Sequence, residues 1–397
     1  MGILQLVTPI IMMSYSLTAA GIQTAISHFT ASCLQKRNYA LCKKYLFSGL
    51  LFSFFLSLIY SLIIYGQAEN ISLYFLKEGR CIPLLQILAF SFPLSALHSC
   101  FSGYYYGKKE TTLPALCQIT EQMVRILTVI LLFYLFEAKK IPFTIALTCF
   151  GTFMGELASF LLTFFFYMKK EQKATISRET VLFPLITFSL PLTFHRVMVN
   201  ILNSIEAVSF PLALRMFGYS KEVSLSIYGV FTGMALSLIL FPSTFPNSAA
   251  VLILPTVSEA KACENYRKIR STLYKTMCAS LTLGIFFGII FYFFSSFLGN
   301  FLFHSILSGI MIRNLSFLCP FLYLHTTLSS ILNGLNKTVQ NLFINIFSLL
   351  LRLGFVMQII PQKGINGYLM GLLLSEISCC GLCLWCLRKY LDCNLKI

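Results

Sequence analysis

Residues 98–125 read HSCFSGYYYGKKETTLPALCQITEQMVR, and this stretch decides the fold class. One apolar run ends here, a turn follows at Lys108, Lys109 and Glu110, and a second apolar run begins. Four polar residues of the second run recur at i, i+3, i+4 and i+7, the spacing of one helix face: Gln118, Glu121, Gln122 and Arg125. A charged side chain at the centre of a membrane helix costs about 3 kcal/mol. We therefore expect a membrane helix whose polar face has a function.

The same pattern returns in the second half of the chain, at one constant shift in residue number. Eight residues of the first copy recur without a gap: Pro93, Leu97, His98, Ser102, Gly107, Thr111, Ile119 and Arg125 match Pro320, Leu324, His325, Ser329, Gly334, Thr338, Ile346 and Arg352. The same shift carries Asn38 onto Asn265. Agreement of proline, histidine, glycine and arginine at one register indicates an internal duplication.

The composition indicates a membrane protein. Of the 397 residues, 57% are hydrophobic and 11% are charged, with a mean hydropathy of +0.79. A soluble domain has about 25% charged residues. The apolar residues form runs of about 20, the length that a helix needs to cross a bilayer. Strands of a membrane barrel would instead alternate apolar and polar residues. We therefore expect an all-α polytopic membrane protein.

The net charge of +16 is explained by the placement of lysine and arginine in the loops. Nineteen of them lie in one alternate set of loops and eight in the other. Cytoplasmic loops carry such an excess, so the first set is predicted to face the cytoplasm. The remaining three, Arg125, Arg196 and Arg352, lie within the spans. Nucleic acid is not an expected partner.

Eleven membrane spans are predicted, at about 3–32, 45–66, 82–105, 112–136, 142–168, 181–210, 226–255, 272–296, 314–334, 338–360 and 365–388. Moving the span at 181–210 back by the shift of the repeat gives positions before Met1. We therefore expect a six-plus-six repeat without its first helix. It would form an N-lobe of five helices, 1–175, and a C-lobe of six, 176–397. An even number of helices per repeat makes the halves parallel.

Two sequence patterns predict local helix geometry. Gly151 and Gly155 form a GxxxG pattern, which is typical of close packing between membrane helices. Pro242 and Pro246, followed by polar residues, predict a bend beside a cavity.

A second polar helix is predicted over 181–210. It carries His195, Arg196, Asn200, Asn203 and Glu206, of which the arginine and both asparagines share a face. Together with the first polar stripe, this face can line a cleft between the two lobes. The alternative for the first stripe is that Glu121 and Arg125 only pair with each other in a packed interior.

Several further groups are candidates for a coupling ion, H⁺ or Na⁺. Glu156 and Glu376 lie in the last helix of each half and are either ion sites or contacts between helices. The other coupling candidates are Glu121, Glu206 and His195. His98 and His325 are expected to hydrogen-bond a loop near the cytoplasm, or to be protonated near neutrality.

The fourteen cysteines are scattered through apolar runs and are expected to be structural thiols. Cys379, Cys380, Cys383 and Cys386 have near-ligand spacing, but no histidine or aspartate stands beside them in the sequence. We predict no metal site and no cofactor. The sequence has no phosphate-binding glycine loop, HExxH motif or Ser/His/Asp set, which argues against an enzyme.

Several segments of the chain resemble a known family. They are GILQLVTPI (2–10), LPALCQITEQMVRI (113–126), LPLTFHRVMVNILNSIEAV (190–208) and VLILPTVSEA (251–260). They resemble the stage V sporulation protein B branch of the oligosaccharide flippases, which are relatives of the lipid II flippases. That branch belongs to the multidrug/oligosaccharidyl-lipid/polysaccharide exporter (MOP) superfamily. The resemblance implies a MATE-like, two-lobed transporter of lipid-linked sugar precursors in the bacterial cytoplasmic membrane, serving spore cortex assembly. The missing first helix departs from this pattern.

The predicted function is a flippase for an undecaprenyl-pyrophosphate-linked saccharide, such as a peptidoglycan or spore-cortex precursor, that works by alternating access of the two lobes. The planar fork of arginine suits a pyrophosphate in a low-dielectric cleft, so Arg196, Arg125 and Arg352 are the predicted anion contacts. The predicted contacts to sugar or phosphate oxygens are Asn200, Asn203, Gln118 and Gln122. Two alternatives stay open: a cation-coupled multidrug antiporter using Glu121 or Glu206, and a non-transporting scaffold for cell-wall assembly.

Overall fold

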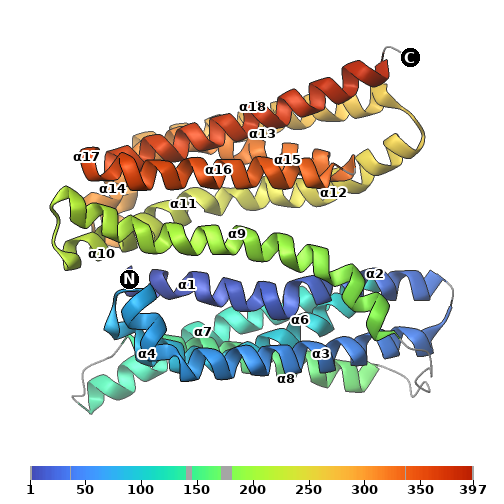
Figure 1. Cartoon of the computed structure of the whole chain (residues 1–397), viewed down its shortest axis with the longest axis horizontal. Helices are drawn as coiled ribbons and strands as arrows, with labels where there is room; N and C mark the ends of the chain where they lie inside the picture. The colour runs from blue at the N-terminus through green and yellow to red at the C-terminus, as the bar shows by residue number, and fades with distance from the viewer. Residues whose placement is uncertain (1, 36, 140–144, 171–180, 336, 396–397) are drawn as a thin grey trace. The chain divides into compact units, whose positions relative to one another are not determined.

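The computed structural model describes residues 2–35, 37–139, 145–170, 181–335 and 337–395, which are helical almost throughout (Figure 1). No β-strand occurs in these ranges. Ten of their helices are long and apolar enough to cross a membrane, and the bent pair Gly79–Ala89 and Ser91–Gly107 raises the number to eleven. The predicted all-α polytopic architecture with about eleven spans is confirmed.

The chain divides into two compact units. The N-terminal unit comprises Leu6–Ser204, and the C-terminal unit comprises Met1–Gln5 with Ile205–Ile397. Helix α9 (Leu182–Phe217) contributes its first part to the former and its last part to the latter. The predicted lobe boundary between 175 and 176 lies outside the described residues, so that boundary stays a prediction.

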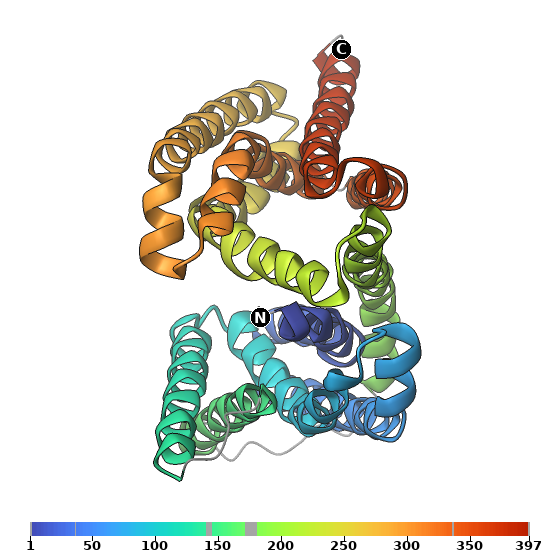
Figure 2. The ribbon, with the colours of Figure 1, turned by 90° about the vertical axis from the view of Figure 1, so that its left-hand side faces the viewer.

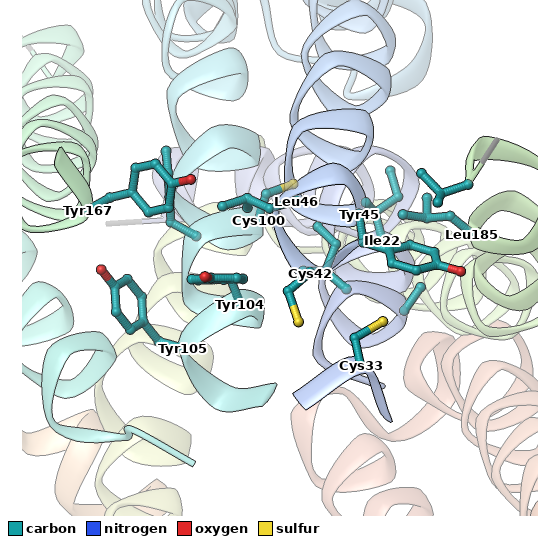
Figure 3. Packing of buried hydrophobic residues seen from close by; sticks show 14 of the residues in the cluster. Ile22, Cys33, Cys42, Tyr45, Leu46, Cys100, Tyr104, Tyr105, Tyr167 and Leu185 are labelled. Carbon is teal, nitrogen blue, oxygen red and sulfur yellow. The ribbon is translucent and has the colours of Figure 1, made fainter. Parts of the chain in front are cut away.

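The N-terminal unit is a helical bundle whose long helices run alongside one another (Figures 1 and 2). Its elements are α1 (Gly2–Tyr15), η1 (Ser16–Ala20), α2 (Gly21–Gln35), α3 (Tyr39–Gly66), α4 (Ala68–Asn70), η2 (Ile71–Phe75), η3 (Gly79–Cys81), α5 (Ile82–Ala89), α6 (Ser91–Gly107), α7 (Thr112–Ala138) and α8 (Ala146–Lys170), followed by the start of α9. Helix α6 is central, because it packs against α2, α3 and α8, while α7 packs mainly on α8. Figure 3 shows the resulting core, in which Tyr104 of α6 lies close to Tyr167 of α8, and Cys100 of α6 lies beside Leu46 of α3.

The C-terminal unit repeats this packing. Its elements after α9 are α10 (Lys221–Val230), η4 (Phe231–Leu236), α11 (Ser237–Leu240), η5 (Phe241–Ser243), α12 (Thr244–Ala262), α13 (Tyr266–Phe303), α14 (Ile306–Leu315), η6 (Ser316–Leu318), α15 (Cys319–Gly334), α16 (Thr338–Gln358), α17 (Ile360–Lys363) and α18 (Ile365–Leu395). Here α15 packs against α12, α13 and α18, and α16 packs on α18. These are the counterparts of α6, α2, α3, α8 and α7, in the same arrangement of neighbours.

The duplication is also visible in single backbone positions. Asn38 caps α3 by accepting from the Leu41 amide, and Asn265 caps α13 by accepting from the Lys268 amide. The residues before these caps both have positive φ, 55° at Arg37 and 53° at Glu264. A non-glycine residue rarely adopts this conformation, so its recurrence at equivalent positions supports the predicted repeat.

Both repeats also interrupt a long helix at equivalent places. The π-helical turn η1 begins at Ser16, and the 3-10 turn η5, which contains Pro242, ends at Ser243, the repeat counterpart of Ser16. Such interruptions release backbone groups from the regular helical ladder. A 3-10 turn therefore occurs at Pro242, and the predicted bend itself stays a prediction. The predicted cavity beside it stays a prediction.

Candidate functional site

Close packing of α7 on α8 positions the first polar cluster. A Cβ atom on Gly155 would lie 2.8 Å from the carbonyl oxygen of Glu121, and one on Gly151 would lie 2.6 Å from Cγ2 of Val129. The two helices approach so closely only because both positions lack a side chain. The GxxxG prediction of close helix packing is confirmed, and the contact places Glu156 against the polar face of α7.

Glu121, Arg125, Glu156 and His98 form this cluster, to which α6, α7 and α8 all contribute. The Arg125 guanidinium forms an ion pair with Glu121, one turn earlier on α7. One ligating atom each from His98, Glu121 and Glu156 lie within 4.8 Å of one another. Two buried atoms of the cluster, Glu156 Oε2 and Arg125 Nε, have no hydrogen-bond partner within the described ranges. The cluster therefore keeps capacity for a further donor and a further acceptor.

The polar stripe of α7 is divided by this packing. Glu121 and Arg125 are half-buried, whereas Gln118 and Gln122 are exposed. In the alternative interpretation, Glu121 and Arg125 only pair with each other. Their ion pair does form, so this interpretation accounts for part of what is observed. It does not describe all of it, since Nε of the arginine is left without a partner among the described residues. The substrate role of these four residues stays a prediction.

The start of α9 forms a second polar group with the interrupted helix α1–η1–α2. The Asn200 amide nitrogen donates to the Met12 carbonyl oxygen at 3.2 Å and to Ser16 Oγ at 2.5 Å. Asn200 thereby satisfies a backbone carbonyl just before the π-helical turn. Asn203 is half-buried and has no hydrogen bond to any residue in the described part of the chain.

Arg196 lies one turn before Asn200 and faces the same region. Its neighbour is the hydroxyl of Tyr15, which donates to Gln23 Oε1 at 2.6 Å. Among the described residues, no carboxylate pairs with Arg196. His195 lies beside it, and its buried Nε2 has no hydrogen-bond partner in the same ranges. The structure thus groups Arg196 and Asn200 with Tyr15, Ser16 and Gln23 of the interrupted helix α1–η1–α2.

The third polar group lies in the C-terminal unit. Arg352 of α16 donates to Glu206 Oε2 of α9 at 2.5 Å, and the Tyr368 hydroxyl of α18 donates to Glu206 Oε1 at 2.6 Å. Both carboxylate oxygens of Glu206 are therefore occupied. The rings of Phe210 and Phe231 pack edge-on against Tyr368, with centroids 4.7 and 5.1 Å away, so the ion pair has an aromatic boundary.

The expectation that the two histidines bond a loop is wrong, because both contact helical residues. His98 is buried and lies 3.3 Å from Ser102 Oγ on its own helix. His325 lies between Glu376 and Cys379 of α18, with 3.1 Å from each ring nitrogen to its partner. The cysteine cluster of α18 has no histidine near it in the sequence, and α15 provides one in the folded structure. These residues come together through the packing of two helices, which the spacing of residues along one helix cannot predict.

The sequence patterns also missed two tyrosines. Tyr15 borders Arg196 and Tyr368 binds Glu206, but each stands in an apolar run among other aromatic residues. An aromatic residue in a membrane helix carries no signal of a polar contact unless the partner helix is known. Glu206 is on the predicted polar helix, yet the structure gives it to a different group from Arg196.

The chain matches the family model described as polysaccharide biosynthesis protein over residues 1–261. Over its full length it is 24% identical to stage V sporulation protein B of Bacillus subtilis (strain 168), with 78% of that protein covered. The lipid II flippase MurJ of the same bacterium is 19% identical over 68% of this chain and 53% of its own length.

Solved structures support the same assignment of fold. An inward-facing multidrug resistance MATE family transporter of the MOP superfamily matches with a TM-score of 0.80 at 14% identity, covering 100% of this chain and 91% of that one. The predicted MATE-like fold and the family resemblance are confirmed. With its apolar spans and these relatives, the chain is a multi-pass protein of the bacterial cytoplasmic membrane.

Proposed function

The chain belongs to the polysaccharide biosynthesis protein family, and from this premise we propose that it is a flippase for an undecaprenyl-pyrophosphate-linked saccharide. Its likeness to a lipid II flippase and to a sporulation protein favours a peptidoglycan or spore-cortex precursor. The proposed cycle exposes the binding site first to one side of the membrane and then to the other.

The observation that carries the proposal is the guanidinium of Arg196, which has no carboxylate partner among the described residues. It lies fourteen residues into α9, about 21 Å along the helix axis. A charge at such depth is expensive, and membrane proteins that retain one use it with a partner. A pyrophosphate has the charge and the geometry to be that partner.

Polar, uncharged side chains near Arg196 could bind the sugar and the other phosphate oxygens of such a headgroup. Asn200, Ser16 and Gln23 offer amide and hydroxyl groups, which bind sugar and phosphate oxygens without adding charge. Arg125 offers a second cation with a buried Nε that has no partner among the residues described. Joint action of the two arginines on one headgroup remains part of the proposal.

Glu156 is the best candidate for a coupling ion in this scheme. Its Oε2 is buried and without a hydrogen-bond partner in the described chain, close to His98 and Glu121. A carboxylate in that state binds a proton or Na⁺ at little cost in lost contacts. Glu121 and Glu206 are poorer candidates, because each already pairs with an arginine.

The same pairing weighs against the cation-coupled multidrug antiporter. That function would use Glu121 or Glu206 as the exchanged carboxylate, which would have to leave its arginine in every cycle. Separating the more deeply buried of the two pairs, Glu206 and Arg352, would leave an uncompensated charge at a cost of about 3–5 kcal/mol. The geometry of these two residues therefore favours an anionic substrate.

The experiment that tests the function is a flipping assay in proteoliposomes containing a fluorescent undecaprenyl-pyrophosphate disaccharide. The wild-type chain should move the lipid between leaflets, and Arg196→Ala should slow this by about tenfold to a hundredfold, the loss of one charge-assisted contact. Arg196→Lys keeps the charge without the planar fork and should fall between the two.

Arg215→Ala is the matched control, because Arg215 lies on the same helix but is exposed in its last turn. It should flip at the wild-type rate. Equal rates for Arg196→Ala and wild type would overturn the site assignment. A wild-type chain that moves no lipid, yet restores spore formation in a strain lacking its flippase, would favour the cell-wall scaffold instead.

A further inference from the structure

A cluster of metal-ligating side chains lies between α15 and α18, outside the arginine sites. His325 Nε2 is 3.1 Å from Cys379 Sγ, and Cys383 Sγ completes a set of three ligating atoms within 4.8 Å of one another. Cys379 and Cys383 are both 0% exposed. They lie four residues apart and so share one face of α18, which is the face turned toward α15.

Glu376 fixes the orientation of the imidazole. Its Oε2 lies 3.1 Å from His325 Nδ1, so that nitrogen donates to the carboxylate and Nε2 is directed toward the two sulfurs. Histidines that bind metals almost always make such a contact through the other ring nitrogen. The carboxylate lies one turn before Cys379 on α18, so a single helix positions both the sulfurs and the group that orients the ring.

The donor set selects the type of ion. Thiolate and imidazole prefer zinc and other thiophilic metals, whereas Na⁺ and Mg²⁺ prefer oxygen. Two thiolates, a neutral imidazole and a divalent ion sum to zero charge. The metal thus neutralises two thiolates that would be costly as isolated charges at an apolar helix interface, while the nearby Glu376 carboxylate accepts a hydrogen bond from the imidazole. Three protein ligands from two helices would also tie those helices together.

The duplication supplies an independent observation. His98 is the repeat counterpart of His325, and the same shift carries Glu156 onto Cys383. The first repeat gathers His98, Glu121 and Glu156 within the same 4.8 Å. The same place in both repeats thus collects ligating groups, with oxygen donors in one and sulfur donors in the other.

We propose that His325, Cys379 and Cys383 bind one Zn²⁺ ion that ties α15 to α18, with Glu376 as a positioning residue. Binding to the folded state alone raises thermal stability, and above the dissociation constant the gain grows with the logarithm of the free Zn²⁺ concentration. The role is structural and is independent of the lipid that the protein carries.

Cobalt titration of the purified, reduced full-length chain in detergent tests the proposal. Co²⁺ replaces zinc in such sites and reports its ligands through visible ligand-field bands and a sulfur-to-cobalt charge-transfer band. We expect saturation at one Co²⁺ per chain, bleaching on addition of Zn²⁺ and a Tm that rises with Zn²⁺. Cys379→Ser and Cys383→Ser should each reduce the charge-transfer band and weaken binding at least tenfold.

Two further variants separate ligands from neighbours. Cys386→Ser removes a thiol one turn beyond Cys383 on the same helix and should leave the spectrum unchanged. Glu376→Gln should keep the bands but weaken affinity by about tenfold or more, because the imidazole loses its orienting partner. Each variant is scored only after it elutes as a monodisperse species without metal.

The wild-type titration decides the matter even where a variant fails to fold. Absence of both bands from the wild-type chain at saturating Co²⁺ would overturn the site. So would bands that survive in the Cys379→Ser/Cys383→Ser double variant, because the sulfur ligands would then lie elsewhere.

Discussion

Arg352 of α16 donates to Glu206 of α9, with 2.5 Å between Nη2 and Oε2. Its repeat counterpart, Arg125, pairs instead with Glu121, one turn earlier on the same helix. At the position equivalent to Glu121, the second repeat has Ser348. Both repeats therefore neutralise the same arginine, but each draws the carboxylate from a different element. Both repeats have kept a carboxylate partner for this arginine, but the helix that provides the carboxylate differs between them.

The Glu206–Arg352 pair should be important for stability. Arg352→Met leaves the carboxylate of Glu206 with only Tyr368, and Glu206→Gln leaves the guanidinium without its anion. Each single variant should lower the free energy of unfolding by about 3 kcal/mol, the cost of an uncompensated buried charge. Denaturant titration of the purified protein in detergent measures this.

The double variant Glu206→Gln/Arg352→Met is the control for that prediction. It removes both charges, so its loss should be clearly smaller than the sum of the single losses. Additive losses would show that the two side chains do not depend on each other.

Helix packing at Gly155 should tolerate no side chain. A methyl group there would meet the Glu121 carbonyl oxygen at 2.8 Å, which forces α7 and α8 apart. Gly155→Ala should therefore destabilise the protein by about 1–3 kcal/mol, as overpacking does. The matched control is Gly381→Ala in α18, where a Cβ meets nothing within 4 Å. Because alanine favours a helix by about 1 kcal/mol, the control should be neutral or stabilising in the same unfolding measurement.

The membrane spans and the duplication could be predicted because they depend on local patterns. Apolar run length gives a span, and identities at a fixed shift give a repeat. Asn38 and Asn265 were visible as one of these identities, and the structure adds that each of them caps its own helix. The close packing at Gly151 and Gly155 was visible for the same reason, because the motif itself creates the contact.

The grouping of the polar residues could not be predicted in the same way. Arg196 and Glu206 lie on one predicted helix, but α9 contributes its two ends to different compact units. Likewise, His325 and Cys379 are far apart in the sequence, and only the packing of α15 on α18 brings them to 3.1 Å. Spacing along a helix gives the face that a residue occupies, whereas its partner depends on which helix covers that face.

Asn200 should stabilise the packing of α9 on the interrupted helix α1–η1–α2. Its amide donates to the Met12 carbonyl oxygen and to Ser16 Oγ, so Asn200→Leu removes two hydrogen bonds between α9 and the interrupted helix α1–η1–α2. A loss of about 1–3 kcal/mol in unfolding free energy is expected, together with slower flipping. Asn203→Leu is the matched control on the same helix, since Asn203 has no hydrogen bond in the described ranges. A larger effect of Asn203→Leu than of Asn200→Leu would contradict this role.

Glu156 should connect transport to an ion gradient. Glu156→Gln keeps the shape of the side chain but removes the charge that attracts H⁺ or Na⁺ to the buried Oε2. In vesicles, a Na⁺ or pH gradient should change the wild-type flipping rate, whereas the variant should flip at one rate with or without either gradient. Glu137→Gln, at an exposed position near the end of α7, should respond as wild type does. A gradient response that persists in Glu156→Gln would place the coupling ion elsewhere, because an uncharged amide cannot exchange a proton or hold Na⁺ as a carboxylate does.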